Sequence, residues 1–428
     1  MLVLVVAVFS LMIVLGVPIS MAMLGTTTLF TSILNPGELI AIPHKMFNGI
    51  DSFVLIAIPL FLLVGQLTVY SGLLDSLLEL SRYLVGRLPG GLAQVNILLN
   101  MLMAGISGSA SADAAATGSV LIPSMIREKY DPAFSAAVTA AASTIGPVIP
   151  PSIPMVALGA LVGVSVGRLF LGGVVPGLIV GGLLLLMASL ISRRRRYGRI
   201  DIDWSWKAFG RTVVAASGPL LIPVIIIGGI VGGLFTPTEA SDIAVIIVLV
   251  LGSLVYRRLN LRGIWKAIRD TVYFLGPVML IVSAASVFGT LLITQKAGEI
   301  LASTVLAVSK DPIVILLMIS LIVLFLGCFM EALAIMFLIT PIVMPLVQMA
   351  GIDPIHFGVV LVQGLMIGLI TPPVGISMFI ACSIARIGIN EFTMEAIPFF
   401  MALVLALLIS IFAPQVILFL PNLLIPVR

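Results

Sequence analysis

Apolar residues fill most of this chain in long blocks that short polar loops separate. A block of about 20 apolar residues is long enough to cross the hydrocarbon core of a bilayer as a helix. The pattern therefore predicts an all-α polytopic membrane protein. The predicted membrane segments are residues 2–15, 18–34, 52–70, 93–126, 132–166, 169–191, 212–234, 240–256, 271–293, 313–349, 355–384 and 392–424. At the first of them, the break at Gly16 and Pro18 favours two short segments over one bent span.

Three further segments carry charged residues among apolar ones. Residues 73–88 place Asp75, Glu79, Arg82 and Arg87 between leucines. This mixture is typical of an amphipathic helix that lies along the membrane surface, in contact with lipid. Residues 204–211 and 296–308 are interpreted as surface segments of the same kind.

Composition agrees with a membrane protein and excludes a soluble globular one, because 61% of residues are hydrophobic and 9% are charged. The net charge of +4 needs no nucleic-acid partner, since Lys and Arg gather in cytoplasmic loops of membrane proteins. The two cysteines, Cys328 and Cys382, lie in apolar segments, which speaks against a disulfide framework or a thiolate metal site. The N-terminus lacks a basic region and predicts a retained span, not a cleaved signal peptide.

Residues 132–166 contain several helix-breaking residues in the middle of an apolar block. Gly146, Pro147, Pro150, Pro151 and Pro154 interrupt it. Proline cannot donate a backbone hydrogen bond, so the helix must break and carbonyl groups are freed within the membrane. The break is either a kink packed against its neighbours or a discontinuous helix whose carbonyls bind an ion.

A second copy of this break favours the discontinuous helix. Pro150 and Pro151 match Pro372 and Pro373 at an offset of 222 residues (372 − 150 = 222). The same offset matches Asp131 with Asp353, Pro132 with Pro354, Pro123 with Pro345, Gly105 with Gly327, Phe170 with Phe392 and Pro176 with Pro398. The chain is therefore predicted to be two repeats, residues 1–200 and 201–428. Each holds a re-entrant hairpin (about 93–126 and 313–349) and a broken helix (about 132–166 and 355–384).

The distribution of Lys and Arg predicts that these repeats are inverted in the membrane. One orientation places all but five of the 22 basic residues in the cytoplasm. The five exceptions are Lys45, Arg168, Lys296, Lys310 and Arg428. This orientation puts Asp131 inside and Asp353 outside, so each hairpin must enter and leave the membrane on its own side.

Residues 104–119 are almost entirely small or hydroxylated. Such a stretch is often a close helix contact, but Asp113 lies within it, and a carboxylate inside a membrane is a functional candidate. Hydroxyl and carbonyl oxygens suit a hard cation such as sodium, whereas the N-terminal ends of half-helices suit an anionic substrate. In the second hairpin, Glu331 takes the place of Ser109 (331 − 222 = 109). Glu331 is predicted either to take part in ion or proton coupling or to have a structural role, bonded to the backbone of its own hairpin tip.

An intramembrane serine protease is a weak alternative. Residues 105–108 spell Gly-x-Ser-Gly around Ser107, but a nucleophilic serine needs a base within hydrogen-bond reach. The two histidines, His44 and His356, are predicted at the outer side, away from Ser107. No Walker A motif is present, which excludes ATP hydrolysis through a P-loop.

At residues 105–113, 146–152 and 371–375 the chain resembles the large membrane subunit of tripartite ATP-independent periplasmic (TRAP) transporters. The resemblance implies no enzyme activity but an elevator-type, sodium-driven importer of an organic acid anion in the bacterial inner membrane. A C4-dicarboxylate or a sialic-acid-like carboxylate is the expected substrate class. The implied partners are a small four-span membrane subunit, expected as a separate chain, and a soluble periplasmic substrate-binding protein. The alternative is a one-component anion/sodium symporter.

The resemblance also implies which residues bind ions and substrate, with two or more sodium ions expected. One sodium site comprises Ser107, Ser109, Gly146, Val148 and Pro150. The other comprises Gly327, Gly368, Thr371 and Val374. The substrate anion lies near Ser107, Ser111, Ser152, Thr371 and Ser377, and Asp113 and Glu331 have a coupling or structural role.

Overall fold

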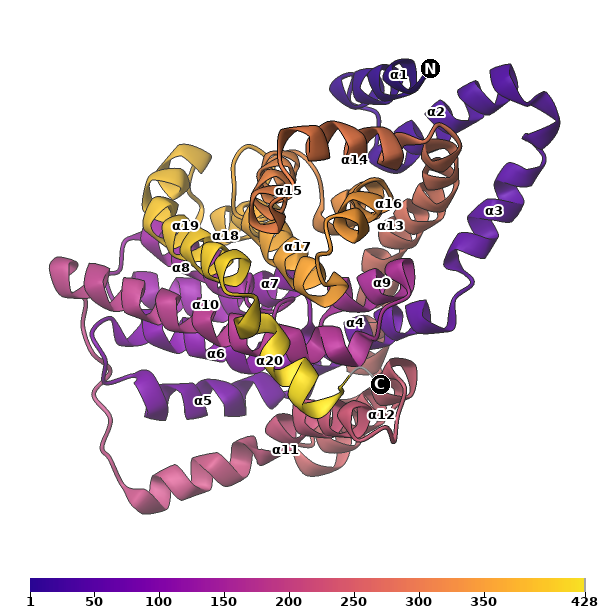
Figure 1. The fold of residues 1–428 in the computed structure, drawn as a ribbon. Coiled ribbons are helices and arrows are strands. Elements are labelled where there is room, and N and C mark those ends of the chain that lie inside the picture. The colour runs from indigo at the N-terminus through magenta and orange to yellow at the C-terminus, as the bar shows by residue number, and fades with distance from the viewer. Residues whose placement is uncertain (427–428) are drawn as a thin grey trace.

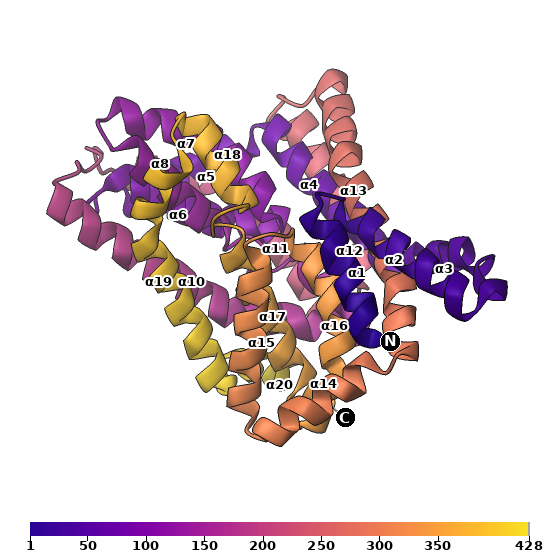
Figure 2. The same ribbon diagram turned by 90° about the horizontal axis from the view of Figure 1, so that it is seen from above.

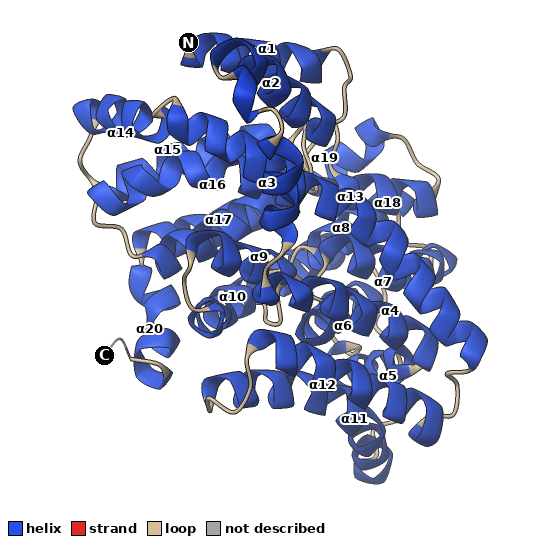
Figure 3. Ribbon diagram, turned by 90° about the vertical axis from the view of Figure 1, so that its right-hand side faces the viewer, coloured by secondary structure: helices blue, strands red, loops and turns tan. Residues whose placement is uncertain are grey.

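The computed structural model describes residues 1–426, and within them the chain is helical with no strand (Figure 1, Figure 3). The helices of the first half are α1 (Leu2–Val14), α2 (Ile19–Leu34), α3 (Ala41–Ile50), α4 (Ala57–Ser71), α5 (Leu73–Val85), α6 (Gly91–Ser107), α7 (Ala110–Arg127), α8 (Pro132–Ser143), α9 (Ile153–Val162) and α10 (Val166–Arg195). Those of the second half are α11 (Trp206–Val231), α12 (Pro237–Val250), α13 (Leu261–Thr294), α14 (Ala297–Val308), α15 (Pro312–Gly327), α16 (Ala332–Met349), α17 (Pro354–Gly368), α18 (Ile376–Ala385), α19 (Ile389–Phe412) and α20 (Pro414–Leu424). Seven segments within this part of the chain are long and apolar enough to cross a membrane.

Two helical hairpins are present where the sequence predicts them. Helices α6 and α7 turn at Gly108 and Ser109, and α15 and α16 turn at residues 328–331. The bounds of α7 plus 222 are those of α16 (110 + 222 = 332 and 127 + 222 = 349). The two hairpins therefore follow the offset that the prolines define.

The two interrupted helices are also present and are built alike. Helices α8 and α17 each begin after an aspartate, and Asp131 and Asp353 each accept a backbone N–H bond of 2.7 Å from the second residue of the helix. Each half-helix then ends, and the chain passes through a loop with a cis Pro-Pro bond before α9 or α18 begins. Proline and glycine prevent the helix from continuing, so both loops lie between half-helices as predicted.

A frame of long helices packs beside the hairpins. Helix α13 lies along α2, α3 and α4, and α12 packs on α4 (Figure 2). The amphipathic helix α5 packs on α6 and α11, and α14 packs on α16. Helices α5 and α14, two of the three predicted surface segments, therefore each contact the hairpin of their own half and a long helix beside it.

The segment that joins the two halves is bonded to the first hairpin. The Gly198 carbonyl accepts hydrogen bonds from the Gly91 amide (3.1 Å) and the Tyr130 hydroxyl (3.3 Å). The Ile200 amide donates to the Gly86 carbonyl (2.9 Å). Residues 198–200 therefore hold together the start of α6 and the corner that follows α7.

Some predicted boundaries were wrong. Residues 204–211 are not a separate surface segment, because α11 runs without interruption from Trp206. Helix α13 begins ten residues before the predicted start at Thr271, and residues 392–424 divide into α19 and α20 at Pro414. Helix α3 was not predicted. These boundaries were predicted at charged residues. Charged residues mark where a helix leaves the lipid, whereas proline and glycine mark where the helix itself ends.

The inverted arrangement of the repeats stays a prediction that labelling can test. In a background with Cys328→Ser and Cys382→Ala, we expect Arg194→Cys and Met349→Cys to react with a membrane-impermeant thiol reagent from opposite sides. Arg194 lies in the basic last turn of α10, and Met349 is exposed four residues before Asp353. Labelling of both positions from the same side of sealed vesicles would contradict the inverted topology.

Candidate functional site

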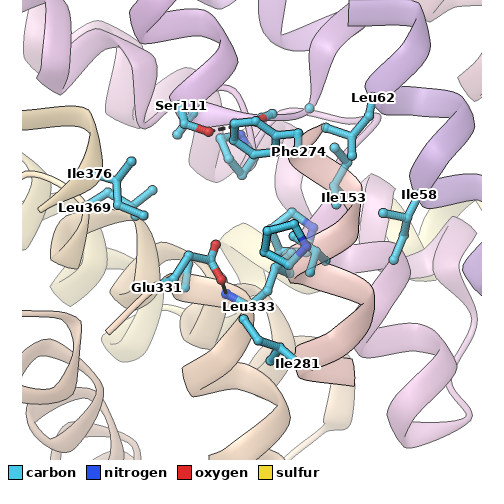
Figure 4. Close-up of a pocket in the computed structure, with 18 of the residues that line it drawn as sticks. Ile58, Leu62, Ser111, Ile153, Phe274, Ile281, Glu331, Leu333, Leu369 and Ile376 are labelled. Atoms are coloured by element: carbon cyan, nitrogen blue, oxygen red, sulfur yellow. Dashed lines mark hydrogen bonds between the residues drawn. The ribbon is translucent and has the colours of Figure 1, made fainter. Parts of the chain in front are cut away.

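A cavity of about 330 Å³ lies at the centre of the protein, between the two hairpin tips and the frame (Figure 4). Ser109 and Ser111 line it from hairpin α6–α7, and Glu331 and Leu333 from hairpin α15–α16. The frame closes it with apolar side chains of α4 and α13. These wall residues are Ile58, Leu62, Phe274, Pro277, Val278 and Ile281.

Four helices begin at the wall of this central cavity. Their first residues are Ala110 of α7, Ile153 of α9, Ala332 of α16 and Ile376 of α18, and all four line it. The N-terminal end of a helix carries a partial positive charge and unpaired N–H groups, which attract anions. No Lys or Arg lines the cavity in the described part of the chain. The groups there that attract an anion are backbone N–H groups, and they act against the carboxylate of Glu331, which also lines the cavity.

Three of these helix starts are capped by a side chain and one is not. Ser109, Ser152 and Glu331 cap α7, α9 and α16, and Glu331 Oε2 accepts from the Leu333 amide at 2.8 Å. No side chain caps α18. Its Ile376 and Ser377 amides donate no hydrogen bond within residues 1–426, and the buried Ser377 hydroxyl has no partner there. Ser377 does not line the cavity, so α18 offers it the Ile376 amide, and α7 offers the Ala110 and Ser111 amides, which also donate no hydrogen bond among the described residues.

Asp113 lies behind the first hairpin tip, fully buried. Its Oδ1 accepts a hydrogen bond from the Ser107 hydroxyl at 2.5 Å, and its Oδ2 has no partner. A Cβ built on Gly146 would collide with Oδ2, so this oxygen faces the loop between α8 and α9. A buried carboxylate oxygen without a donor is costly unless a cation neutralises it. Either a proton on Asp113 or a cation between hairpin α6–α7 and this loop would neutralise it.

Glycine at the hairpin tip is required by two features of the backbone. Gly108 has a φ of +61°, and a Cβ there would lie 2.5 Å from the Pro151 carbonyl oxygen. The Gly108 carbonyl also accepts from the Ile153 amide at 3.4 Å. The tip of hairpin α6–α7 is thus in backbone contact with the loop that precedes α9.

The second hairpin meets the second loop in a similar way. A Cβ on Gly327 would lie 2.7 Å from the Gly368 Cα, so the two backbones touch. The Val374 amide donates to the Cys328 carbonyl at 3.0 Å, and the Thr371 hydroxyl donates to the Ile367 carbonyl at 2.8 Å. Gly327, Gly368, Thr371 and Val374, predicted as one site, therefore lie around the C-terminal ends of α15 and α17.

Two residues of the predicted sites point elsewhere. The Val148 carbonyl faces α10, because a Cβ on Gly173 would collide with it. The Ser152 hydroxyl donates to the Pro147 carbonyl and accepts from the Met155 amide. Ser152 is buried and does not line the cavity, so its contacts are those of a helix cap. Glu331, in contrast, lines the cavity. Its carboxylate also accepts from the amides at the start of α16, and this capping contact favours a structural role.

Two further cavities flank the frame. The first, about 470 Å³, is lined by Gln66, Ser111, Asp113, Ser119 and Asp270, and we call it the Asp270 cavity. The second, about 500 Å³, we call the Asn48 cavity. It is lined by Asn48, Ser52, Ser286, Thr290, Thr340 and Gln348, among others. The Asp270 cavity shares Ser111, Tyr273 and Phe274 with the central cavity, so these two spaces adjoin.

The apolar wall residues of α4 and α13 were not predicted. Ile58, Leu62, Phe274 and Ile281 carry no chemical signal, since an apolar residue that faces a cavity looks in sequence like one that faces lipid. The only signal was indirect, because α4 and α13 fall at equivalent places of the two repeats (57 + 222 = 279, within α13).

The serine protease arrangement is absent from this site. Ser107 bonds to Asp113, and the His356 ring bonds to the Ser410 carbonyl at 2.8 Å. His44 lies on α3, at the edge of the frame. Neither histidine is a hydrogen-bond partner of Ser107 within the described residues, so Ser107 lacks the histidine base that the protease arrangement requires.

Comparisons with known proteins identify a single family. Residues 6–416 match the sequence model described as "Tripartite ATP-independent periplasmic transporter, DctM component". The chain is 39% identical to the uncharacterized protein YgiK of Salmonella typhimurium (98% of this chain, 96% of the relative). It is 36% identical to the sialic acid TRAP transporter large permease protein SiaM of Vibrio cholerae (95% of each). It is 38% identical to the isethionate TRAP transporter permease protein DctMQ of Oleidesulfovibrio alaskensis (95% of this chain, 64% of the relative).

A comparison of folds agrees with a membrane transporter. The YdaH transporter of Alcanivorax borkumensis superposes with a TM-score of 0.63 over 89% of each chain, at 16% identity. At that identity the likeness concerns the fold alone.

Proposed function

The chain belongs to the DctM component family of tripartite ATP-independent periplasmic transporters, and from this we propose that it imports an organic anion together with sodium ions. Membership confirms the resemblance drawn from the hairpin and the two Pro-Pro breaks. It makes the chain a large permease subunit, a multi-pass protein of the bacterial inner membrane and not an enzyme.

The observation that carries the proposal is the meeting of four helix starts at one cavity without Lys or Arg. An anionic group placed there faces the N-terminal ends of α7, α9, α16 and α18. Its best donors are the Ile376 amide of α18 and the Ala110 and Ser111 amides of α7, because these residues line the cavity and their amides have no other partner among the described residues. Ser109 and Ser111 lie across the cavity on the first hairpin and offer hydroxyl groups to the rest of the substrate.

Sodium is proposed at the opposite ends of the half-helices. C-terminal helix ends expose carbonyl oxygens, which suit a hard cation. At the first site, Asp113 Oδ2 and the Ser107 hydroxyl face the end of α8 near Gly146. At the second site, carbonyls near Gly327 and Gly368 come together with the Thr371 hydroxyl. Two ions of this kind neutralise the buried carboxylate and balance the charge of the substrate.

The substrate class follows from the cavity and from the relatives. A cavity of about 330 Å³ with apolar walls accepts a small organic molecule whose charged group reaches the α18 start. The names of the relatives mention sialic acid, a carboxylate, and isethionate, a sulfonate. We therefore propose an organic acid anion, with C4-dicarboxylates and sialic-acid-like carboxylates as the first candidates.

We further propose an elevator movement and two partner proteins. The hairpins and interrupted helices form one packed unit, and α5 and α14 lie between it and the frame, where arms of a moving domain belong. The relative DctMQ is longer than this chain, which covers 64% of it, as expected if a small membrane subunit is fused there. A separate four-span subunit would extend the frame here, and a periplasmic binding protein would deliver the anion.

A reconstitution series tests this function. Proteoliposomes would contain this chain alone, with the small subunit, or with the small subunit and a periplasmic binding protein. Sialic acid, succinate and isethionate are the radiolabelled probes, under separate sodium and proton gradients. We expect uptake only with both partners, only under the sodium gradient, and only for the anion that the binding protein carries.

Two results would overturn parts of the proposal. Uptake driven equally well by a proton gradient without sodium would contradict sodium coupling. Full sodium-driven uptake by this chain alone would make it the one-component anion/sodium symporter that the sequence analysis left as the alternative.

A further inference from the structure

Asp270 is the one carboxylate that reaches the Asp270 cavity from the frame. It belongs to α13, and its side chain is 29% exposed. The Tyr70 hydroxyl of α4 donates to its Oδ2 at 2.7 Å, and Arg269 Nη2 lies 3.2 Å from its Oδ1. Arg269 itself does not line the cavity and is 55% exposed. The pair therefore presents its negative end to the cavity and its positive end to the surroundings.

The equivalent position of the other repeat is neutral. An offset of 222 matches Asp270 with Asn48 (270 − 222 = 48), and Asn48 lines the cavity on the other side of the frame. No Asp, Glu, Lys or Arg lines that Asn48 cavity among the residues that the structure describes. The two cavities thus differ in their carboxylates, because Asp270 and Asp113 line one and no carboxylate lines the other.

The other charged groups near these routes do not cancel this difference. Asp113 also lines the Asp270 cavity, but it is fully buried, and its free oxygen faces Gly146, where sodium is proposed. Glu331 lines the central cavity, so its charge repels an anion in that cavity whichever side the anion comes from. Tyr273 lines both the Asp270 cavity and the central cavity. Asp270 lies about one helical turn before it, which is about 5 Å along the helix axis. That distance is shorter than the screening length of about 8–10 Å at physiological salt.

We infer that Asp270 makes its cavity an exit for the substrate anion, by lowering the affinity for anions there relative to the Asn48 cavity. This inference rests on the proposed anion transport. Asp270 raises the energy of an anion in that cavity, so an anion that has been released binds again from that side less readily and fewer anions return by that route. An anion in the Asn48 cavity meets no charged side chain among the described residues, although this cavity shares no lining residue with the central cavity. The predicted topology places the Asp270 cavity on the cytoplasmic side, which fits import.

The charge itself can be measured without knowing the substrate. In a background with Cys328→Ser and Cys382→Ala, Ser119→Cys places one thiol in the Asp270 cavity, and Thr290→Cys places one in the Asn48 cavity. Two methanethiosulfonate reagents of similar size are compared, one bearing a trimethylammonium group and one a sulfonate. We expect Asp270→Asn to lower the ratio of cationic to anionic reaction rates at position 119 by about tenfold, about threefold for each reagent. At position 290 the ratio should stay unchanged.

Controls separate charge from structure. Asparagine can still accept the Tyr70 hydrogen bond, and Tyr70→Phe removes that bond but keeps the charge. Tyr70→Phe should therefore leave the ratio within about twofold of its original value, and raising the salt to about 1 M should shrink the effect of Asp270→Asn. A ratio at position 119 that does not respond to Asp270→Asn, or responds equally to Tyr70→Phe, would overturn the inference.

A transport measurement tests the consequence. Proteoliposomes with both partners are loaded with increasing unlabelled probe anion, and the initial uptake of the labelled anion is measured. We expect Asp270→Asn to lower the internal concentration that halves uptake by about three- to fivefold, with little change when the interior is empty. Uptake by the wild type into empty vesicles tests the proposed function separately. Unchanged inhibition from inside, or a change only in the sodium requirement, would overturn the exit role.

Discussion

Asp113→Asn should weaken the response of this protein to sodium while leaving its fold intact. The asparagine side chain can still accept the Ser107 hydrogen bond, but the substitution removes the charge of an oxygen that has no donor and faces Gly146. Loss of one member of a buried charge pair costs about 3 kcal/mol or more, so the affinity for sodium should fall roughly 100-fold. Sodium-driven uptake in the complete reconstituted system should fall at least about tenfold at physiological sodium.

A second readout for Asp113→Asn needs no partner proteins. A bound ion stabilises the folded protein in proportion to the logarithm of its concentration over its dissociation constant. The melting temperature of the purified wild type should rise with sodium, and part of that rise should vanish in the variant. Asp75→Asn is the matched control, because Asp75 is a 60% exposed carboxylate in an ion pair with Arg258. If both variants kept the full sodium-dependent shift, Asp113 would not bind sodium.

Gly108→Ala is expected to have the other large effect, by displacing the tip of the first hairpin. A left-handed φ of +61° costs an alanine about 1–2 kcal/mol, and its Cβ would lie 2.5 Å from the Pro151 carbonyl oxygen. Because the contact is with backbone, the hairpin tip and the loop before α9 must separate. Overpacking of this kind adds about 1–3 kcal/mol. We expect uptake to fall more than about tenfold and the free energy of unfolding to fall by about 2–5 kcal/mol.

Gly163→Ala is the control that isolates the clash. Gly163 ends α9 with a φ of +75°, yet no atom lies within 4 Å of a Cβ built there. This variant carries the same backbone cost without a contact, so it should lose only about 1–2 kcal/mol and keep its transport rate. Equal losses of uptake in the two variants would mean that the contact between Gly108 and Pro151 is unimportant.

The sequence predicted best those features that single residues impose on the backbone. Proline ends helices and glycine permits the tight turns, so the interrupted helices and hairpin tips were found near Pro150, Pro372 and Gly108. Features that depend on tertiary surroundings were not found. The sequence cannot distinguish the wall residues Ile58 and Phe274 from residues that face lipid.

Polar residues posed a related difficulty, because the same side chain can bind a ligand or cap a helix. Ser152 was assigned to the substrate but caps α9, whereas Ser377 has no partner in the described structure. The difference lies in whether a backbone group is within reach of the hydroxyl. That depends on how the loops at residues 144–152 and 369–375 fold, which residue types alone do not specify.

The four helix starts at the central cavity bear on how such a protein can diverge. The positive potential there belongs to peptide groups, which every residue except proline supplies with its N–H, so it survives almost any side-chain replacement that preserves the helices. Mutations in the walls can therefore alter the size and polarity of the cavity without removing its attraction for negative charge. A carrier built in this way can acquire a new cargo through a few substitutions, and a comparison of basic residues between two such carriers would not reveal that their cargoes differ.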